Sequence, residues 1–302
     1  MPEKPNIIYI FSDQHRGDTL GSVGHPAVIT PNMDKLASEG VNFTRCCTSS
    51  PLCMPARASM MTGKYVNEHK VWTNFVEANP NGPSHVRNIR EAGYHTALIG
   101  KTHLWIHGKG KKERPTSVNA EDIGKNGFLE KMGFTKIHTK DKKSILEDWG
   151  FTDIYELTGP IASIVVDSPY TDYLKEKGLL RTHRKYMIEY FTKWNKGEAK
   201  PWEEPPCPLP TEDHMDSFTG RKTVEWIHNY KDDKPFYLQV LFPGPHDPFD
   251  SPAEYRAMYN PEDMPVGILE WPQKPIPGNV RTVLNWSGLK GMTPAQNQLL
   301  RT

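Results

Sequence analysis

The chain has 302 residues, of which 36% are hydrophobic and 24% are charged, a composition typical of a globular protein. Its formal net charge is +1, which provides no broad field for nucleic acid or an anionic membrane, so recognition of an anion must be local. No stretch approaches the ~18 apolar residues of a membrane-spanning helix, and no signal-peptide segment follows Met1. We therefore expect a cytoplasmic protein without nucleic-acid or membrane partners, or a periplasmic or secreted one if a signal has been removed.

The strands are predicted from apolar segments. Residues 6–14, residues 94–104 with a stop at Gly100, and residues 236–242 are apolar runs without a polar face, which is typical of strands in a parallel sheet. The first of them is expected to be buried on both faces. A shorter strand is expected at residues 41–47.

Helices are predicted between these strands from their start and stop signals. Thr30 and Pro31 begin one helix and Gly40 ends it. The other predicted helices are 84–93, short helical patches within 167–210, 216–230, and a last one that begins at Thr293-Pro294. The alternation of strands and helices predicts an α/β fold with a mixed, mostly parallel central sheet flanked by helices.

The region of about 104–215 is predicted to be a loop-rich excursion from this sheet. Its first part, residues 108–143, is rich in lysine and in turn residues and has little periodicity. We expect a solvated, variable loop there.

Polar side chains follow each of the three long strands. Asp13 ends the first, Lys101 and His103 end the second, and His246 with Asp247 follows the third. In open α/β sheets, ligands bind at the carboxyl ends of the strands. These residues are therefore predicted to converge on one crevice.

The stretch of residues 50–63 contains a cysteine at the start of a predicted helix. Cys53 is followed by Pro55 and, one turn later, by Arg57. A helix start and a nearby cation both favour an anion. This placement predicts a low-pKa thiolate at Cys53, or a group made from one.

The other cysteines carry no such pattern. The chain has four cysteines, too few for a disulfide framework, and no two form a C-x-x-C pair, so the spacing predicts no structural zinc site. We interpret Cys46 and Cys47 as structural residues and Cys207 as a loop thiol.

The sequence from Cys53 to Arg57, followed by Thr62-Gly63, resembles the C-x-P-x-R signature of type I sulfatases in the alkaline phosphatase-like superfamily. Four other segments resemble family landmarks and occur in the family's order: PNIIYIFSDQ, TPNMDKLASEGVNFTRC, GYHTALIGKTHL and PGPHDPF. The resemblance implies the fold of that superfamily. It also implies that residues 1–302 form an N-terminal catalytic domain that is incomplete, because a DHG-like stretch and a later lysine of the family are missing.

The resemblance implies a role for each matching residue. Cys53 corresponds to the residue that a formylglycine-generating enzyme converts to formylglycine, the nucleophile. Among the other catalytic residues, Arg57 holds the formylglycine oxygens and Lys101 binds sulfate. His103 contacts the formylglycine hydroxyl, and His246 binds sulfate or protonates the leaving group.

The implied metal ligands are Asp13, Gln14 and the group at position 53. The ion implied is Ca²⁺, which prefers oxygen ligands. Many sulfatases have two adjacent aspartates where this chain has Asp13-Gln14, so Mn²⁺ stays an alternative.

The expected function is hydrolysis of a small sulfuric ester. Two alternatives stay open: hydrolysis of phosphonate monoesters or phosphodiesters at the same centre, and a truncated relative without catalytic activity. The sequence does not distinguish aryl, choline and carbohydrate sulfates.

Overall fold

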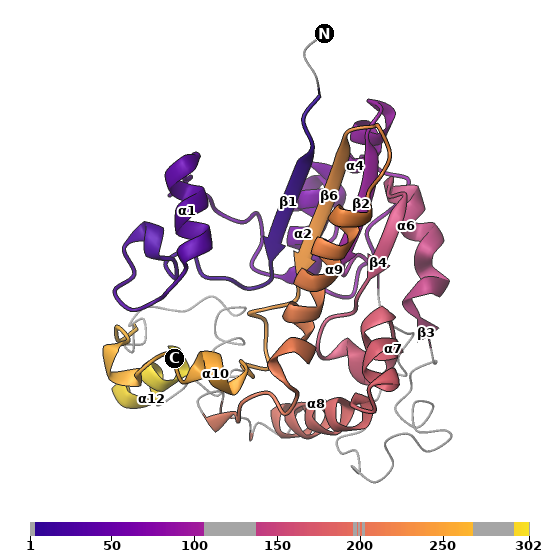
Figure 1. Ribbon diagram of the computed structural model, residues 1–302. Coiled ribbons are helices and arrows are strands. Elements are labelled where there is room, and N and C mark those ends of the chain that lie inside the picture. The colour runs from indigo at the N-terminus through magenta and orange to yellow at the C-terminus, as the bar shows by residue number, and fades with distance from the viewer. Residues whose placement is uncertain are drawn as a thin grey trace.

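The computed structural model describes residues 4–105, 137–195, 198, 200, 203–267 and 293–301 (Figure 1). Most of the lysine-rich segment predicted at 108–143 lies outside these residues. So do residues 268–292.

In the described part of the chain, the central sheet has four parallel strands in the order β1-β6-β2-β4. These are β1 (Ile7–Ser12), β6 (Phe236–Phe242), β2 (His95–Gly100) and β4 (Asp153–Glu156). In register, Ile10 lies opposite Val240, and Gly100 lies opposite Leu241. The predicted α/β fold with a parallel sheet is confirmed, and all three long strands occur where they were expected.

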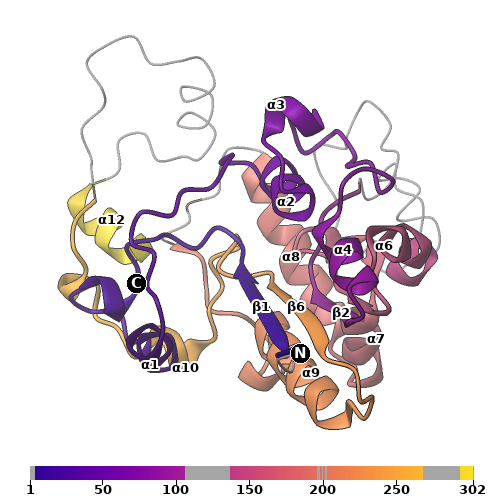
Figure 2. The ribbon, with the colours of Figure 1, turned by 90° about the horizontal axis from the view of Figure 1, so that it is seen from above.

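Helices cover both faces of the sheet (Figures 1 and 2). On one face α2 (Cys53–Thr62), α4 (His85–Glu91) and α6 (Lys143–Trp149) pack against side chains of β2 and β6 such as Leu98 and Leu241. On the other face α9 (Met215–Asn229) packs through Trp226 and Ile227 against the alternate side chains of the same strands. Because successive side chains of a strand point to opposite faces, a strand covered on both sides must be apolar throughout.

The remaining helices lie around this core. They are α1 (Pro31–Glu39), α3 (Val66–His69), α7 (Pro169–Glu176), α8 (Leu180–Asn195), α10 (Ala253–Arg256) and α12 (Pro294–Arg301). Short 3-10 helices occur at Gly21–Val23, Thr139–Lys142, Ala162–Ile164, Thr211–Asp213 and Pro261–Asp263. A second small sheet pairs β3 (Ile137–His138) with β5 (Val166–Asp167).

The helix signals of the sequence were reliable. Pro31 stands at the first position of α1 and Gly40 follows its end. The Ser84 side chain accepts a hydrogen bond from the Arg87 N–H at the start of α4. Capping residues act within one turn of chain, so their signal can be recognised locally.

Two strand predictions were wrong. Residues 41–47 form no strand, and Phe43 is 78% exposed there. The first strand exists, but it is not buried on both faces, since Ile8 is 46% and Ile10 is 61% exposed. β1 is at the edge of the sheet and pairs only with β6 among the described residues. The core clusters formed with the described helices contain side chains of β2 and β6 but, from β1, only Phe11, so most of β1 is left uncovered.

The region 104–215 has more regular structure than was predicted. In its described part it contains α6, α7 and α8 and contributes β4 to the central sheet. Tyr170 and Leu174 of α7 are buried in a cluster with Phe218 of α9. The helical patches predicted at 167–210 thus join the fold through their apolar faces.

Gly100 allows β2 and β6 to lie close together at the end of β2. It has a positive φ of 123°, and a Cβ atom there would lie 2.0 Å from the carbonyl oxygen of Leu241. Only glycine avoids both the contact and the strain.

We expect Gly100→Ala to lower the free energy of unfolding by ~3 kcal/mol or more, measured by urea unfolding. Gly220→Ala in α9 is the matched control, because a Cβ there meets no atom within 4 Å. That change should raise stability by ~0.5–1 kcal/mol, since alanine favours a helix interior. Equal stability of the two variants would contradict this account of Gly100.

Candidate active site

The predicted convergence of polar side chains occurs at the carboxyl ends of β1, β2 and β6. Asp13 follows β1, Lys101 follows β2, and His246 lies in the loop after β6. Backbone hydrogen bonds fix the strand ends to one another, since the Asp13 N–H donates to Gly244 O at 3.0 Å and the Lys101 N–H donates to Leu241 O at 3.0 Å. The start of α2 brings Cys53 to the same place.

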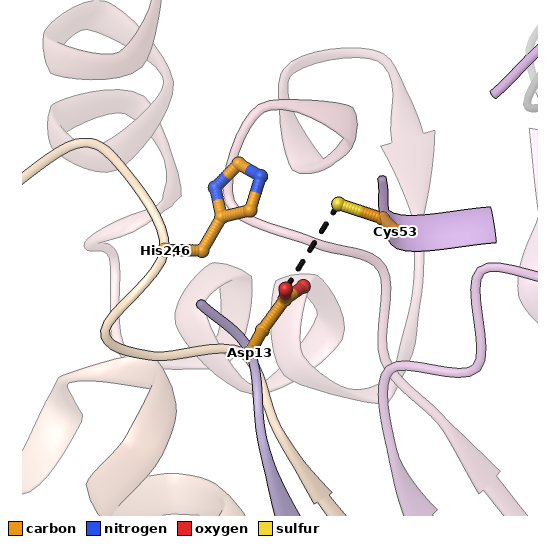
Figure 3. A group of neighbouring side chains, drawn as sticks. All are labelled: Asp13, Cys53 and His246. Atoms are coloured by element: carbon orange, nitrogen blue, oxygen red, sulfur yellow. Dashed lines mark hydrogen bonds between the residues drawn. The ribbon is translucent and has the colours of Figure 1, made fainter. Parts of the chain in front are cut away.

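Asp13, Cys53 and His246 face one another (Figure 3). One ligand atom from each, the carboxylate oxygen, the sulfur and a ring nitrogen, lies within 4.8 Å of the other two. Cys53 Sγ is 3.9 Å from Asp13 Oδ1. These three side chains come from positions 13, 53 and 246, so only the fold brings them together.

Two cations hold the carboxylate of Asp13. Lys101 Nζ lies 2.6 Å and Arg57 Nη2 lies 3.2 Å from Asp13 Oδ2, and all three side chains are at most 7% exposed. Burial by itself raises the pKa of Asp13, but Lys101, Arg57 and His246 outweigh it and lower this pKa well below the usual range. Asp13 is therefore an anion at any physiological pH.

Arg57 is fixed within the protein on several sides. Its guanidinium donates to the carbonyl oxygens of Lys101 and Thr102 as well as to Asp13, and lies 5.2 Å from the centre of the Phe11 ring. Among the described residues, its buried Nε has no hydrogen-bond partner. Arg57 thus keeps one donor for a group bound beside it.

Of the two alternatives predicted for Cys53, the low-pKa thiolate was wrong, whereas a group made from the cysteine stays a prediction. Burial first and the charge of Asp13 second raise the pKa of this thiol. Lys101, Arg57 and the backbone at the helix start lower it, but by less. Lys101 and Arg57 both contact the Asp13 carboxylate, whose negative charge offsets part of their effect on the sulfur. As cysteine, residue 53 is a neutral thiol.

Gln14 and His103 lie shortly after the ends of β1 and β2, and both have an unusual backbone conformation. Both have a positive φ, 64° for Gln14 and 51° for His103. The Gln14 side chain is exposed and His103 is half-buried. Their assigned roles stay predictions, whereas Asp13, Cys53, Arg57, Lys101 and His246 form one connected group.

The structure adds supporting residues that the sequence analysis did not single out. The Asn74 side chain accepts a hydrogen bond at 2.9 Å from the Met54 N–H at the start of α2. Glu156, at the end of β4, accepts from the Thr102 N–H at 3.1 and 3.2 Å. Gly159 lies against Lys101, where a Cβ would be 2.8 Å from its Cε. No local pattern marks these residues, because their contacts join distant segments.

A cavity of about 690 Å³ opens beside His246. Its lining is mainly apolar and includes Tyr170, Met187 and Phe249, together with the polar side chains of Cys207, His214 and Asp250. A cavity of this size can hold a small organic molecule.

The chain belongs to the Sulfatase family, which matches it over residues 5–271. It is 29% identical over 297 residues to an arylsulfatase of Clostridium perfringens, covering 95% of this chain and 54% of that protein. It is 33% identical over 261 residues to a choline-sulfatase of Rhizobium meliloti, covering 85% of this chain and 41% of that protein. The chain thus spans about half the length of the curated relatives it matches.

A solved structure has the same fold. The phosphonate monoester hydrolase of Agrobacterium radiobacter superposes with a TM-score of 0.60 at 25% identity, covering 87% of this chain and 45% of that one. The expected alkaline phosphatase-like sulfatase fold is confirmed. No helix of the described residues has the length and apolar character needed to cross a membrane.

The raised pKa of Cys53 predicts slow alkylation by iodoacetamide at pH 8 with a chelator present. In a background of C46S, C47S and C207S, Asp13→Asn should lower this pKa and speed alkylation several-fold, because a negative charge near the sulfur is removed. Asp18→Asn, an exposed residue paired with Arg16, is the control and should change nothing. An unchanged rate in Asp13→Asn would contradict the electrostatic account.

Glu156 should make stability depend on pH. Burial is the main cause that raises its pKa from 4.5 to about 8, so the folded protein binds a proton that the unfolded chain releases. The free energy of unfolding therefore has its full contribution from protonated Glu156 below pH 4.5. This contribution falls by ~1.4 kcal/mol per pH unit between pH 4.5 and about pH 8. Glu156→Gln should remove this fall, measured by urea unfolding at several pH values. Parallel curves for the two proteins would show that Glu156 is ionised in the fold.

Proposed function

We propose that this chain is the N-terminal portion of a sulfuric ester hydrolase whose nucleophile is formylglycine made from Cys53. The observation that carries the proposal is the group formed by Cys53, Asp13 and His246, with Lys101 and Arg57 on the Asp13 carboxylate. The names of the relatives, an arylsulfatase and a choline-sulfatase, support a sulfate ester as substrate.

Formylglycine would be introduced at Cys53 by a formylglycine-generating enzyme that acts on the Cys53–Arg57 motif. Its hydrated aldehyde supplies the attacking oxygen, a role for which the neutral thiol found here is unsuited. The half-buried side chain at position 53 faces both Asp13 and His246 (Figure 3), so the oxygen would arise between a carboxylate and an imidazole.

The surrounding side chains are suited to sulfate and to its leaving group. Lys101, Arg57 and the Asp13 carboxylate that they contact together carry one net positive charge beside the reacting position, which favours the binding of an anionic group. His246 Nδ1 lies 2.7 Å from the carbonyl oxygen of Asp247, which can only accept, so this nitrogen carries a proton. The other ring nitrogen is then available to exchange a proton with a leaving group.

The residues described here fit the implied metal only in part. Asp13 Oδ1 faces position 53, whereas Oδ2 is held by Lys101 and Arg57. Ca²⁺ takes six to eight oxygen ligands, and Mn²⁺ also prefers carboxylate and water oxygens. One carboxylate, the amide oxygen proposed for Gln14 and the group at position 53 supply too few oxygen ligands to complete such a site.

Phosphonate monoester hydrolysis is the second candidate. Asp13-Gln14 replaces the paired aspartates of many sulfatases, and the solved phosphonate monoester hydrolase shares the fold at 25% identity. The same charges that favour a sulfate group also favour a phosphonate.

We expect the full-length protein, co-expressed with a formylglycine-generating enzyme, to hydrolyse an aryl or choline sulfate faster than an aryl phosphonate monoester. Cys53→Ala should lower the rate ~10³-fold or more, because the nucleophile is lost. Mass spectrometry of the peptide that contains residue 53 reports whether the conversion has occurred.

Cys46→Ala is the matched control, because Cys46 is exposed and should leave the rate unchanged. Faster phosphonate turnover would favour the second candidate. Conversion of Cys53 without turnover of either ester class would indicate a non-catalytic relative.

A further inference from the structure

A second group of side chains with the spacing needed to hold a metal ion is separate from the Asp13 group. Cys207, His214 and Asp250 each offer one ligand atom within 4.8 Å of the other two. They lie near the N-terminal end of α9, where α8 also lies (Figure 1). We propose that these three residues bind a transition-metal ion, with Zn²⁺ as the favoured ion.

Backbone and cap interactions position the three ligands. The Cys207 N–H donates to Asp250 O at 3.1 Å and lies 3.4 Å from Ser251 O, which joins two loops far apart in the sequence. His214 is the N-cap of α9, and its Nδ1 accepts a hydrogen bond from the Asp216 N–H at 3.3 Å. These hydrogen bonds therefore hold the backbone segments of the three ligands in place before an ion binds.

The donor types select the ion. A thiolate, an imidazole and a carboxylate are the ligands of Zn²⁺ sites, whereas Ca²⁺ and Mg²⁺ require mostly oxygen. His214 Nε2 lies 3.9 Å from Asp250 Oδ1, a separation that an ion between the two atoms can bridge. Cys207 would bind as the thiolate, so binding would release its proton.

Asp216 can orient the histidine. Its Oδ2 lies 3.8 Å from His214 Nδ1. When the ion binds Nε2, the neutral imidazole carries its proton on Nδ1, which faces the Asp216 carboxylate. Nδ1 then no longer accepts the cap hydrogen bond from the Asp216 N–H, and the contact with the carboxylate replaces that bond. The other oxygen of Asp216, Oδ1, accepts from the Gly244 N–H at 3.0 Å, two residues before His246. The proposed site is thus connected to the loop that bears His246.

The ion would have one coordination position open. Cys207, His214 and Asp250 all line the cavity of about 690 Å³ that also contacts His246. Three protein ligands and a fourth position open to a cavity are typical of zinc sites that bind water or a substrate atom.

The experiment uses Co²⁺ as a spectroscopic substitute for Zn²⁺. The metal-free 302-residue chain carries C46S, C47S and C53A, so that Cys207 is its only cysteine and the Asp13 group lacks its sulfur. We expect one Co²⁺ per chain, a thiolate-to-cobalt absorption band in the near ultraviolet, and loss of this band when Zn²⁺ is added.

Three further variants test the ligands in the same background. Cys207→Ser should abolish the band, and Asp250→Asn should weaken binding at least tenfold. His214→Asn should do the same while preserving an acceptor at the helix N-cap. His228→Ala, an exposed histidine on the same helix, is the control and should bind like the background chain.

Circular dichroism confirms that each variant is folded. Absence of the thiolate band in the folded background chain would overturn the proposal, and so would its persistence in Cys207→Ser. The absorption band and the binding of Co²⁺ do not depend on ester hydrolysis. The metal-site proposal can therefore fail while the proposed function holds, and the proposed function can fail while the metal site is found.

Discussion

The site depends on one buried interaction, the carboxylate of Asp13 held by Lys101 and Arg57. Each of these charges has lost most of its water, and a buried charge without a partner is costly by several kcal/mol. The contact joins the end of β1, the end of β2 and the first turn of α2. Because the three charges must be buried together, the strand ends and the helix that bears Cys53 are held in one arrangement.

That arrangement also decides the chemistry of position 53. The cations that favour a thiolate are paired with Asp13, and their effect on the sulfur is smaller than the combined effect of burial and the Asp13 charge. The motif alone suggested a reactive thiol. The buried geometry instead raises the pKa of the thiol and keeps it neutral, which is compatible with the proposed conversion of Cys53.

Local signals predicted much of the fold and of the site. Capping residues such as Ser84 and Pro31 act within one turn, and apolar runs marked the three long strands. Polar residues directly after those strands marked the group of side chains that meets at the strand ends. The exposure of β1 could not be predicted, because an edge strand and a central strand can share one apolar pattern while strand order depends on contacts between distant segments.

The sequence by itself determined the family signature around Cys53, the parallel α/β class and the residues that follow each strand, because these features lie within short stretches of chain. The tertiary structure alone decided the pairing of Asp13 with its two cations and the protonation of Cys53. It alone placed Cys207 beside His214 and Asp250, although the cysteine spacing predicted no structural zinc site. The physical reason is that charge, burial and metal ligation depend on distances between atoms, and for residues far apart in the chain the fold sets those distances.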